Sequence, residues 1–132
     1  DFTAIGQADI VVVPYWQHVP ERPPQTLLDS LVQARDRGAE IVGLCLGSFV
    51  LAWAGILDGK RAATHWEFER QFQSLFPNVR LDINALYVDD GNIITSAGTA
   101  AALDCCLYII RQRFGSVVAN QIARRMIVPP HR

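Results

Sequence analysis

The sequence predicts an α/β fold, in which a mostly parallel β-sheet is flanked by helices and carries an appended β-hairpin. Two runs rich in β-branched residues, 9–15 and 39–44, are separated by a helical pattern, which is a β-α-β unit and implies parallel strands. Two later apolar runs flank Asp90-Gly91, a dipeptide typical of hairpin turns. Helical periodicity covers most of the remaining chain.

The first elements follow from short local signals. Residues 9–15, DIVVVPY, predict a buried parallel strand. The loop at 16–24 holds three prolines, which exclude a helix interior. Apolar residues then recur at helical spacing over 24–38, and Gly38 supplies a stop, so we expect a helix. Residues 39–44, AEIVGL, predict a second buried strand.

The middle of the chain predicts two helices around one short strand. The first helix begins after the second strand and ends near Gly55. Residues 61–65, RAATH, predict a short strand. Residues 66–76 place aromatic side chains on one helical face, and Pro77 closes this helix.

The last third predicts a hairpin and two helices. The hairpin spans 85–96. Residues 97–115 are apolar on nearly all sides, so we expect a buried helix that ends at Gly115. A final helix is predicted over 116–128, and order is expected to end at the PPHR segment, 129–132.

Composition predicts one domain, 1–132, in a soluble cytoplasmic protein. Half of the 132 residues are apolar, but no run approaches the length of a membrane span. The net charge of −1 argues against a nucleic-acid-binding surface in this segment alone. The three cysteines form no disulfide framework or zinc-ligand spacing, so we expect no metal, and no cofactor is predicted. Of these, Cys105 and Cys106 lie in an apolar helix and are expected in the core.

Cys45 lies between two glycines where a predicted strand ends and a helix begins. A residue in such a sharp turn adopts a strained backbone conformation, and its neighbours must be small, which Gly43 and Gly47 satisfy. The thiol would project above the carboxyl edge of the sheet, where α/β folds bind ligands. The helix amino end would favour the thiolate. A buried structural cysteine beside two packing glycines explains the same pattern.

His65 is the candidate base for Cys45. If the short strand that ends at His65 lies beside the strand before Cys45, then His65 and Trp66 emerge at the same edge and line one pocket. A polar residue packed against Trp66 is the alternative. His18, in the proline-rich loop, and His131, in the tail, are expected in solvent.

The segment TSAGT, between the hairpin and the following helix, is the third candidate part of the site. Ser96, Gly98 and Thr99 can cap that helix, whose amino end would present N–H groups to an anionic or carbonyl ligand. Capping alone explains these residues equally well.

Three long stretches then identify a family resemblance: GLCLGSFVLAWAGILDGKRAATHW, YVDDGNIITSAGTAAALDCCLYIIR and VANQIARRMIVPPHR. Together they resemble the ThiJ/PfpI-type, class I glutamine amidotransferase-like domain at the front of AraC-family transcription regulators. The resemblance implies a flavodoxin-like sheet with Cys45 at the elbow, a small-molecule effector that is often nitrogen-containing, and a homodimer. It also implies that DNA is bound only through a helix-turn-helix domain outside this chain. We expect the chain to be a fragment that lacks the first strands of the family.

The family resemblance predicts a ligand pocket but weakens a catalytic role. The enzymes of the family carry histidine or threonine after the cysteine, where this chain has Leu46. Their first strand ends in Pro-Gly, whereas Pro14 of this chain is followed by Tyr15 and Trp16. Their acidic partner lies in a part of the family before this chain begins. The expected site is Cys45 and His65, with a ligand held by Tyr15, Trp16, Leu46, Gly47, Trp66, Ser96, Gly98 and Thr99.

Three functions remain open at this point. The chain is predicted to be the effector-sensing and dimerisation domain of an AraC-family regulator. The isocyanide hydratases of the same family also resemble it, which makes a cysteine-dependent hydratase or amidase the alternative. A sensor of oxidants through Cys45 is the third.

Overall fold

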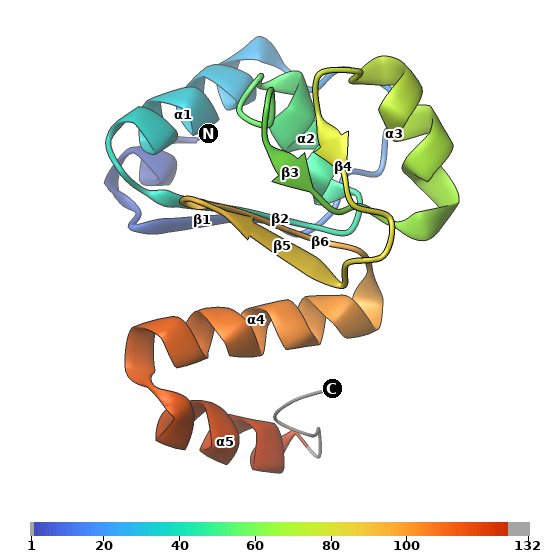
Figure 1. Ribbon diagram of the computed structural model, residues 1–132. Helices are drawn as coiled ribbons and strands as arrows, with labels where there is room; N and C mark the ends of the chain where they lie inside the picture. The colour runs from blue at the N-terminus through green and yellow to red at the C-terminus, as the bar shows by residue number, and fades with distance from the viewer. Residues whose placement is uncertain (1, 127–132) are drawn as a thin grey trace.

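The computed structural model describes residues 2–126, apart from the side chain of Thr99. Figure 1 shows a sheet with helices on both faces. The elements, in chain order, are η1 (Thr3–Gln7), β1 (Ile10–Val13), α1 (Gln25–Asp36), β2 (Glu40–Leu44), α2 (Gly47–Trp53), β3 (Arg61–Ala62), η2 (Trp66–Phe68), α3 (Glu69–Leu75), β4 (Arg80–Leu81), β5 (Tyr87–Asp90), β6 (Ile93–Ser96), α4 (Thr99–Phe114) and α5 (Ser116–Arg125). No helix in this described part is both long and apolar enough to cross a membrane.

The main sheet has the strand order β1-β2-β6-β5. β1 and β6 both pair in parallel with β2, and β5 pairs antiparallel with β6 through the predicted hairpin. Gly91 has a φ of +73°, the conformation that this tight turn requires. The predicted α/β class, with a mostly parallel sheet, flanking helices and a hairpin, is therefore confirmed.

The short strand after α2 does not lie beside β2, so the condition under which His65 would share the edge of Cys45 is not met. β6 occupies the position beside β2, and β3 instead forms a separate two-stranded sheet with β4. β3 is also short, because regular pairing stops at Ala62 and the chain reaches His65 as an irregular segment. The edge that carries Cys45 is thus made by β1, β2 and β6.

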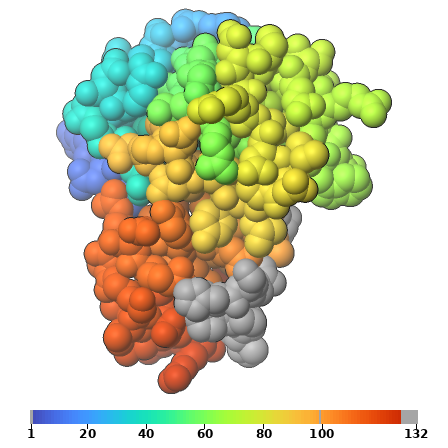
Figure 2. All heavy atoms as spheres, viewed as in Figure 1, coloured from blue at the N-terminus to red at the C-terminus, as the bar shows by residue number. Residues whose placement is uncertain are grey.

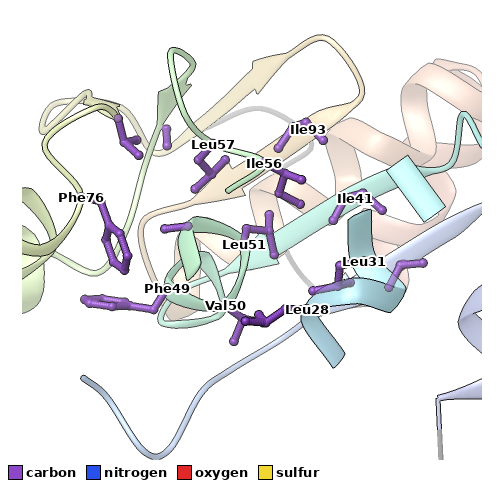
Figure 3. Close-up of a cluster of buried hydrophobic side chains, with 14 of the residues drawn as sticks. Leu28, Leu31, Ile41, Phe49, Val50, Leu51, Ile56, Leu57, Phe76 and Ile93 are labelled. Carbon is purple, nitrogen blue, oxygen red and sulfur yellow. The ribbon is translucent and has the colours of Figure 1, made fainter. Parts of the chain in front are cut away.

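The larger hydrophobic core lies between one face of the sheet and helices α1, α2 and α3. Figure 3 shows side chains from these helices and the sheet converging on one another, with Ile41 of β2 and Phe49 of α2 among them. The Phe49 ring makes edge contacts with Phe72 and Phe76, at centroid distances of 5.1 and 5.9 Å. Such pairs add to the stability that burial alone supplies, so α2 is held firmly beneath the elbow.

The opposite face of the sheet is covered by α4, with α5 packed against the outer side of α4 (Figures 1 and 2). A small cluster forms this second core, namely Val42, Ile94, Cys105 and Ile109. Helix α4 ends at Gly115 as predicted, but it is not buried on all sides. Cys106 is exposed and Leu103 is 37% exposed, so the expectation that Cys106 belongs to the core is wrong.

β1 also differs from its prediction as a buried strand. It lies at an edge of the sheet, and its Val12 side chain is 48% exposed. The predicted last helical residues, 127 and 128, and the segment 129–132 with His131 lie outside the described residues.

Candidate functional site

Cys45 occupies a strained turn between β2 and α2. Its φ is +54°, and in the described part of the chain it is the one residue other than glycine with a positive φ. An L-residue pays conformational energy for this backbone and keeps it only when the surroundings enforce it. The predicted sharp passage from strand to helix is therefore confirmed.

Close backbone approaches explain the two flanking glycines. A Cβ atom on Gly47 would lie 2.0 Å from the carbonyl oxygen of Val13, at the end of β1. A Cβ atom on Gly43 would lie 3.0 Å from Cδ2 of Leu51 and 3.1 Å from the backbone N of Ser48. A larger residue at position 43 would require these neighbours to shift, whereas the contact at Gly47 excludes a larger residue because a backbone carbonyl cannot rotate away.

The thiol of Cys45 is only partly exposed, and burial raises its pKa above the ordinary value. The backbone N–H of Leu46, at the amino end of α2, opposes this shift but does not reverse it. The expectation that the helix end favours the thiolate is therefore wrong in its net direction, since desolvation is the larger cause.

His65 precedes the short helix η2 and is fixed by its neighbours. Its Nδ1 accepts a hydrogen bond of 3.1 Å from the backbone N–H of Glu67, which leaves Nε2 to carry the proton of the neutral ring. The ring stacks on Trp66 with centroids 6.0 Å apart. A Cβ atom on Gly98 would lie 3.7 Å from Cδ2 of His65, so the imidazole contacts the turn before α4.

The TSAGT segment meets the elbow through backbone contacts. The N–H of Cys45 donates to the carbonyl oxygen of Ser96 at 3.2 Å. The Ser96 side chain is fully buried, and its Oγ has no hydrogen-bond partner among the described residues. Gly98 is the residue that precedes α4, and no side chain caps it there. The structure thus brings Cys45 beside Ser96 and His65 beside Gly98.

The remaining predicted ligand residues are divided between surface and core. Tyr15 is 55% exposed. Trp16 packs partly against the larger core and donates from Nε1 to the carbonyl oxygen of Glu21 at 2.8 Å. Leu46 is buried in that core, so it offers little surface to a ligand. Trp66 is 72% exposed and borders an open hollow of about 540 Å³.

Sequence reasoning missed three buried hydroxyl groups near the elbow. Ser48 and Thr64 hydrogen-bond to each other at 2.7 Å, and both lie within reach of the Cys45 carbonyl oxygen. Thr95 of β6 accepts from the backbone N–H of Ala63 at 2.8 Å. The available signal was a polar residue inside each of three apolar runs.

Comparison with known proteins places this arrangement in a family. The model of the DJ-1/PfpI family matches residues 3–112. The HTH-type transcriptional regulator CdhR of Pseudomonas aeruginosa is 40% identical over 91 residues, which cover 69% of this chain and 27% of the regulator. The isonitrile hydratase of Pseudomonas putida is 29% identical over 124 residues, which cover 92% of this chain and 53% of the hydratase.

A solved structure shows the same fold. The crystal structure of an AraC family transcriptional regulator from Pseudomonas putida aligns with a TM-score of 0.82 at 23% identity, over 96% of this chain and 67% of that one. This chain therefore spans about a quarter of the length of CdhR and about half that of the hydratase. Because the family model covers most of the residues, including the elbow, the chain belongs to the DJ-1/PfpI family.

Proposed function

We propose that this chain is the effector-sensing and dimerisation domain of an AraC-type transcriptional regulator, and that it binds a small metabolite beside Cys45. The likeness to CdhR, a protein named as an HTH-type regulator, carries this proposal. DNA contact would come through a helix-turn-helix domain outside this chain, and the regulator would act in the cytoplasm as a homodimer.

The chemistry of the site supports sensing over catalysis. The elbow geometry is intact, but burial raises the pKa of the Cys45 thiol, so little thiolate is present near neutral pH. The next residue, Leu46, is buried and can neither take nor donate a proton. The partly exposed thiol of Cys45, and Nε2 of the His65 ring that contacts the turn at Gly98, still offer polar groups to a small ligand.

The alternative function is a cysteine-dependent hydratase. The isonitrile hydratase alignment favours it, since it extends over 92% of this chain. This reading needs Cys45 as a nucleophile and His65 as a proton carrier. It predicts turnover of an isonitrile that disappears in Cys45→Ala.

Binding to DNA tests the regulator directly. The full-length protein is mixed with DNA from upstream of its own gene, with and without a panel of amino acids and related nitrogen-containing metabolites. We expect one metabolite to change the DNA affinity by about 5- to 150-fold, the usual range for coupled sites. Size measured by sedimentation, with and without the metabolite, checks the dimer.

Two variants separate the two functions. Cys45→Ala is expected to retain metabolite binding and its effect on DNA, and Cys106→Ala, at an exposed position, is the matched control. A full-length protein that binds no DNA would reject the regulator. Isonitrile turnover lost in Cys45→Ala and kept in Cys106→Ala would establish the enzyme instead.

A further inference from the structure

Two buried hydroxyl groups converge on the backbone of Cys45. Ser48 of α2 is fully buried and Thr64 is 3% exposed. The Ser48 Oγ lies 2.9 Å from the Cys45 carbonyl oxygen, and the Thr64 Oγ1 lies 3.3 Å from the same oxygen. The two hydroxyl oxygens are 2.7 Å apart. The carbonyl of the strained residue is therefore held from the helix and from the segment after β3.

The protons of these groups can be assigned in two consistent ways. In one, Ser48 donates to the Cys45 carbonyl and Thr64 donates to Ser48. In the other, Ser48 donates to Thr64 and Thr64 donates to the carbonyl. Each hydroxyl has one proton and each arrangement uses both, so no buried donor is left unpaired in either.

Side-chain hydrogen bonds hold the segment that leads from β3 to His65, where strand pairing is absent. The segment from Ala63 to His65 is not part of either sheet, since β3, which pairs with β4, ends at Ala62. Two side chains hold this segment in place. Thr95 receives the N–H of Ala63 at 2.8 Å, and Thr64 contacts the elbow. The next residue along this segment is His65.

We propose that the Ser48–Thr64 hydroxyl pair positions Cys45, by holding its strained backbone in place and by joining the elbow to the segment that carries His65. A left-handed backbone at an L-residue survives only where the surroundings over-determine it, and this pair supplies directed contacts to the carbonyl of that residue. The inference goes beyond the sensing role, because it concerns the geometry of the thiol whatever ligand the domain binds.

The test is the alkylation of Cys45 by iodoacetamide as a function of pH, followed by mass spectrometry of the purified protein. Ser48→Ala and Thr64→Val each remove one hydroxyl. We expect the alkylation rate of Cys45 to rise about fivefold in each variant. This factor corresponds to a closed conformation of the elbow that is destabilised by about 1 kcal/mol relative to its open conformations. The pH midpoint should fall toward that of an ordinary thiol, because the released thiol is better solvated.

Conservative and matched variants separate positioning from general loosening. Thr64→Ser keeps the hydroxyl and is expected to restore the wild-type rate and midpoint. Ile109→Val removes a buried methyl group from the core on the opposite face of the sheet and leaves every hydroxyl in place, so its melting temperature should fall while the Cys45 profile stays unchanged. Exposed Cys106 serves as the reference rate within each protein.

Either of two results would overturn the proposal. One is a Cys45 profile in Ser48→Ala and Thr64→Val that matches wild type. The other is an equal change in Ile109→Val, which would show that any loss of stability has the same effect. If Thr64→Val does not fold, Ser48→Ala alone decides, since alanine suits a helix and leaves only a small space.

Discussion

At the scale of single residues, the site depends on how closely the end of β1 approaches the start of α2. Gly47 lies at that contact, where the Val13 carbonyl oxygen and the backbone N of Tyr15 both approach the position of a Cβ atom. Neither group is a side chain that can rotate. The elbow can therefore form only if residue 47 has no Cβ atom, whatever the chemistry of the neighbouring thiol.

We predict that Gly47→Ala destabilises the protein by about 3 kcal/mol or more, at the upper end of the usual cost of overpacking. The reason is that a Cβ atom would lie 2.0 Å from the Val13 carbonyl oxygen. Urea denaturation followed by tryptophan fluorescence measures the change. Gly6→Ala is the matched control, because a Cβ atom there meets nothing within 4 Å, and its stability should stay within about 1 kcal/mol of wild type. Equal midpoints for the two variants would contradict the prediction.

The residues at the elbow differ in how readily the sequence reveals them. Cys45 and its flanking glycines were predictable because a strand-to-helix turn imposes local steric rules on adjacent residues. Ser48 and Thr64 were not, since they are 16 positions apart and only the folded chain shows that their hydroxyls meet. The thiol pKa was also missed, because burial depends on all neighbouring elements and outweighs the helix end.

At the scale of secondary-structure elements, a tyrosine joins α4 to the edge strand of the sheet. The Tyr108 hydroxyl donates to the Asp89 carboxylate of β5, and this hydrogen bond, together with some burial, raises the pKa of Tyr108 to about 12. The Tyr108 ring also packs on Tyr87 with centroids 5.0 Å apart. This contact therefore links the lower helix layer to the hairpin.

We predict that one of the three tyrosines titrates near pH 12 and that Asp89→Asn lowers its midpoint toward the ordinary value of about 10. Because folding raises this pKa, the contact contributes its full stability below about pH 10 and loses it as the pH rises toward 12. Absorbance at 295 nm measures the titration. Asp58→Asn makes the same charge change at an exposed site in the turn before β3 and should leave the curve unaltered. A tyrosine midpoint that Asp89→Asn does not move would refute the assignment.

Helices and the hairpin were predictable from local periodicity and turn chemistry, whereas strand order was not. The signal at Asp90-Gly91 correctly indicated the pairing of β5 with β6. The parallel pairing of β6 with β2 joins residues more than 50 positions apart, as in Ile41 with Ile93, and no local pattern encodes it. The condition that the strand before His65 lies beside β2 failed for the same reason, although the His65 ring still reaches the turn before α4.

At the scale of the whole molecule, the two faces of the sheet are covered unequally. The face under α1, α2 and α3 holds the larger core, which includes the Phe49 ring cluster (Figure 3). In the described part of the chain, the hydrophobic cluster on the face covered by α4 has four buried residues. Helix α5 adds only Ala119 and Ala123 as buried side chains. Since buried apolar area supplies most of the stability, the α4–α5 layer should open more easily than the rest.

This difference predicts the order of hydrogen exchange. Backbone amides of α4 and α5 should exchange before those of β2 and α2, because opening the lower layer exposes a small core while the larger one stays closed.

Ile109→Ala, at 9% exposure, removes one of the four buried residues and should speed exchange in α4 and α5 far more than in α2. Ile56→Ala, in the larger core, should instead speed exchange throughout. Mass spectrometry of peptides from the exchanged protein measures each layer separately. Amides of α4 that persist as long as those of β2 would mean that the two layers open together, and that the elbow at Cys45 is coupled to the lower face of the sheet as tightly as to the upper one.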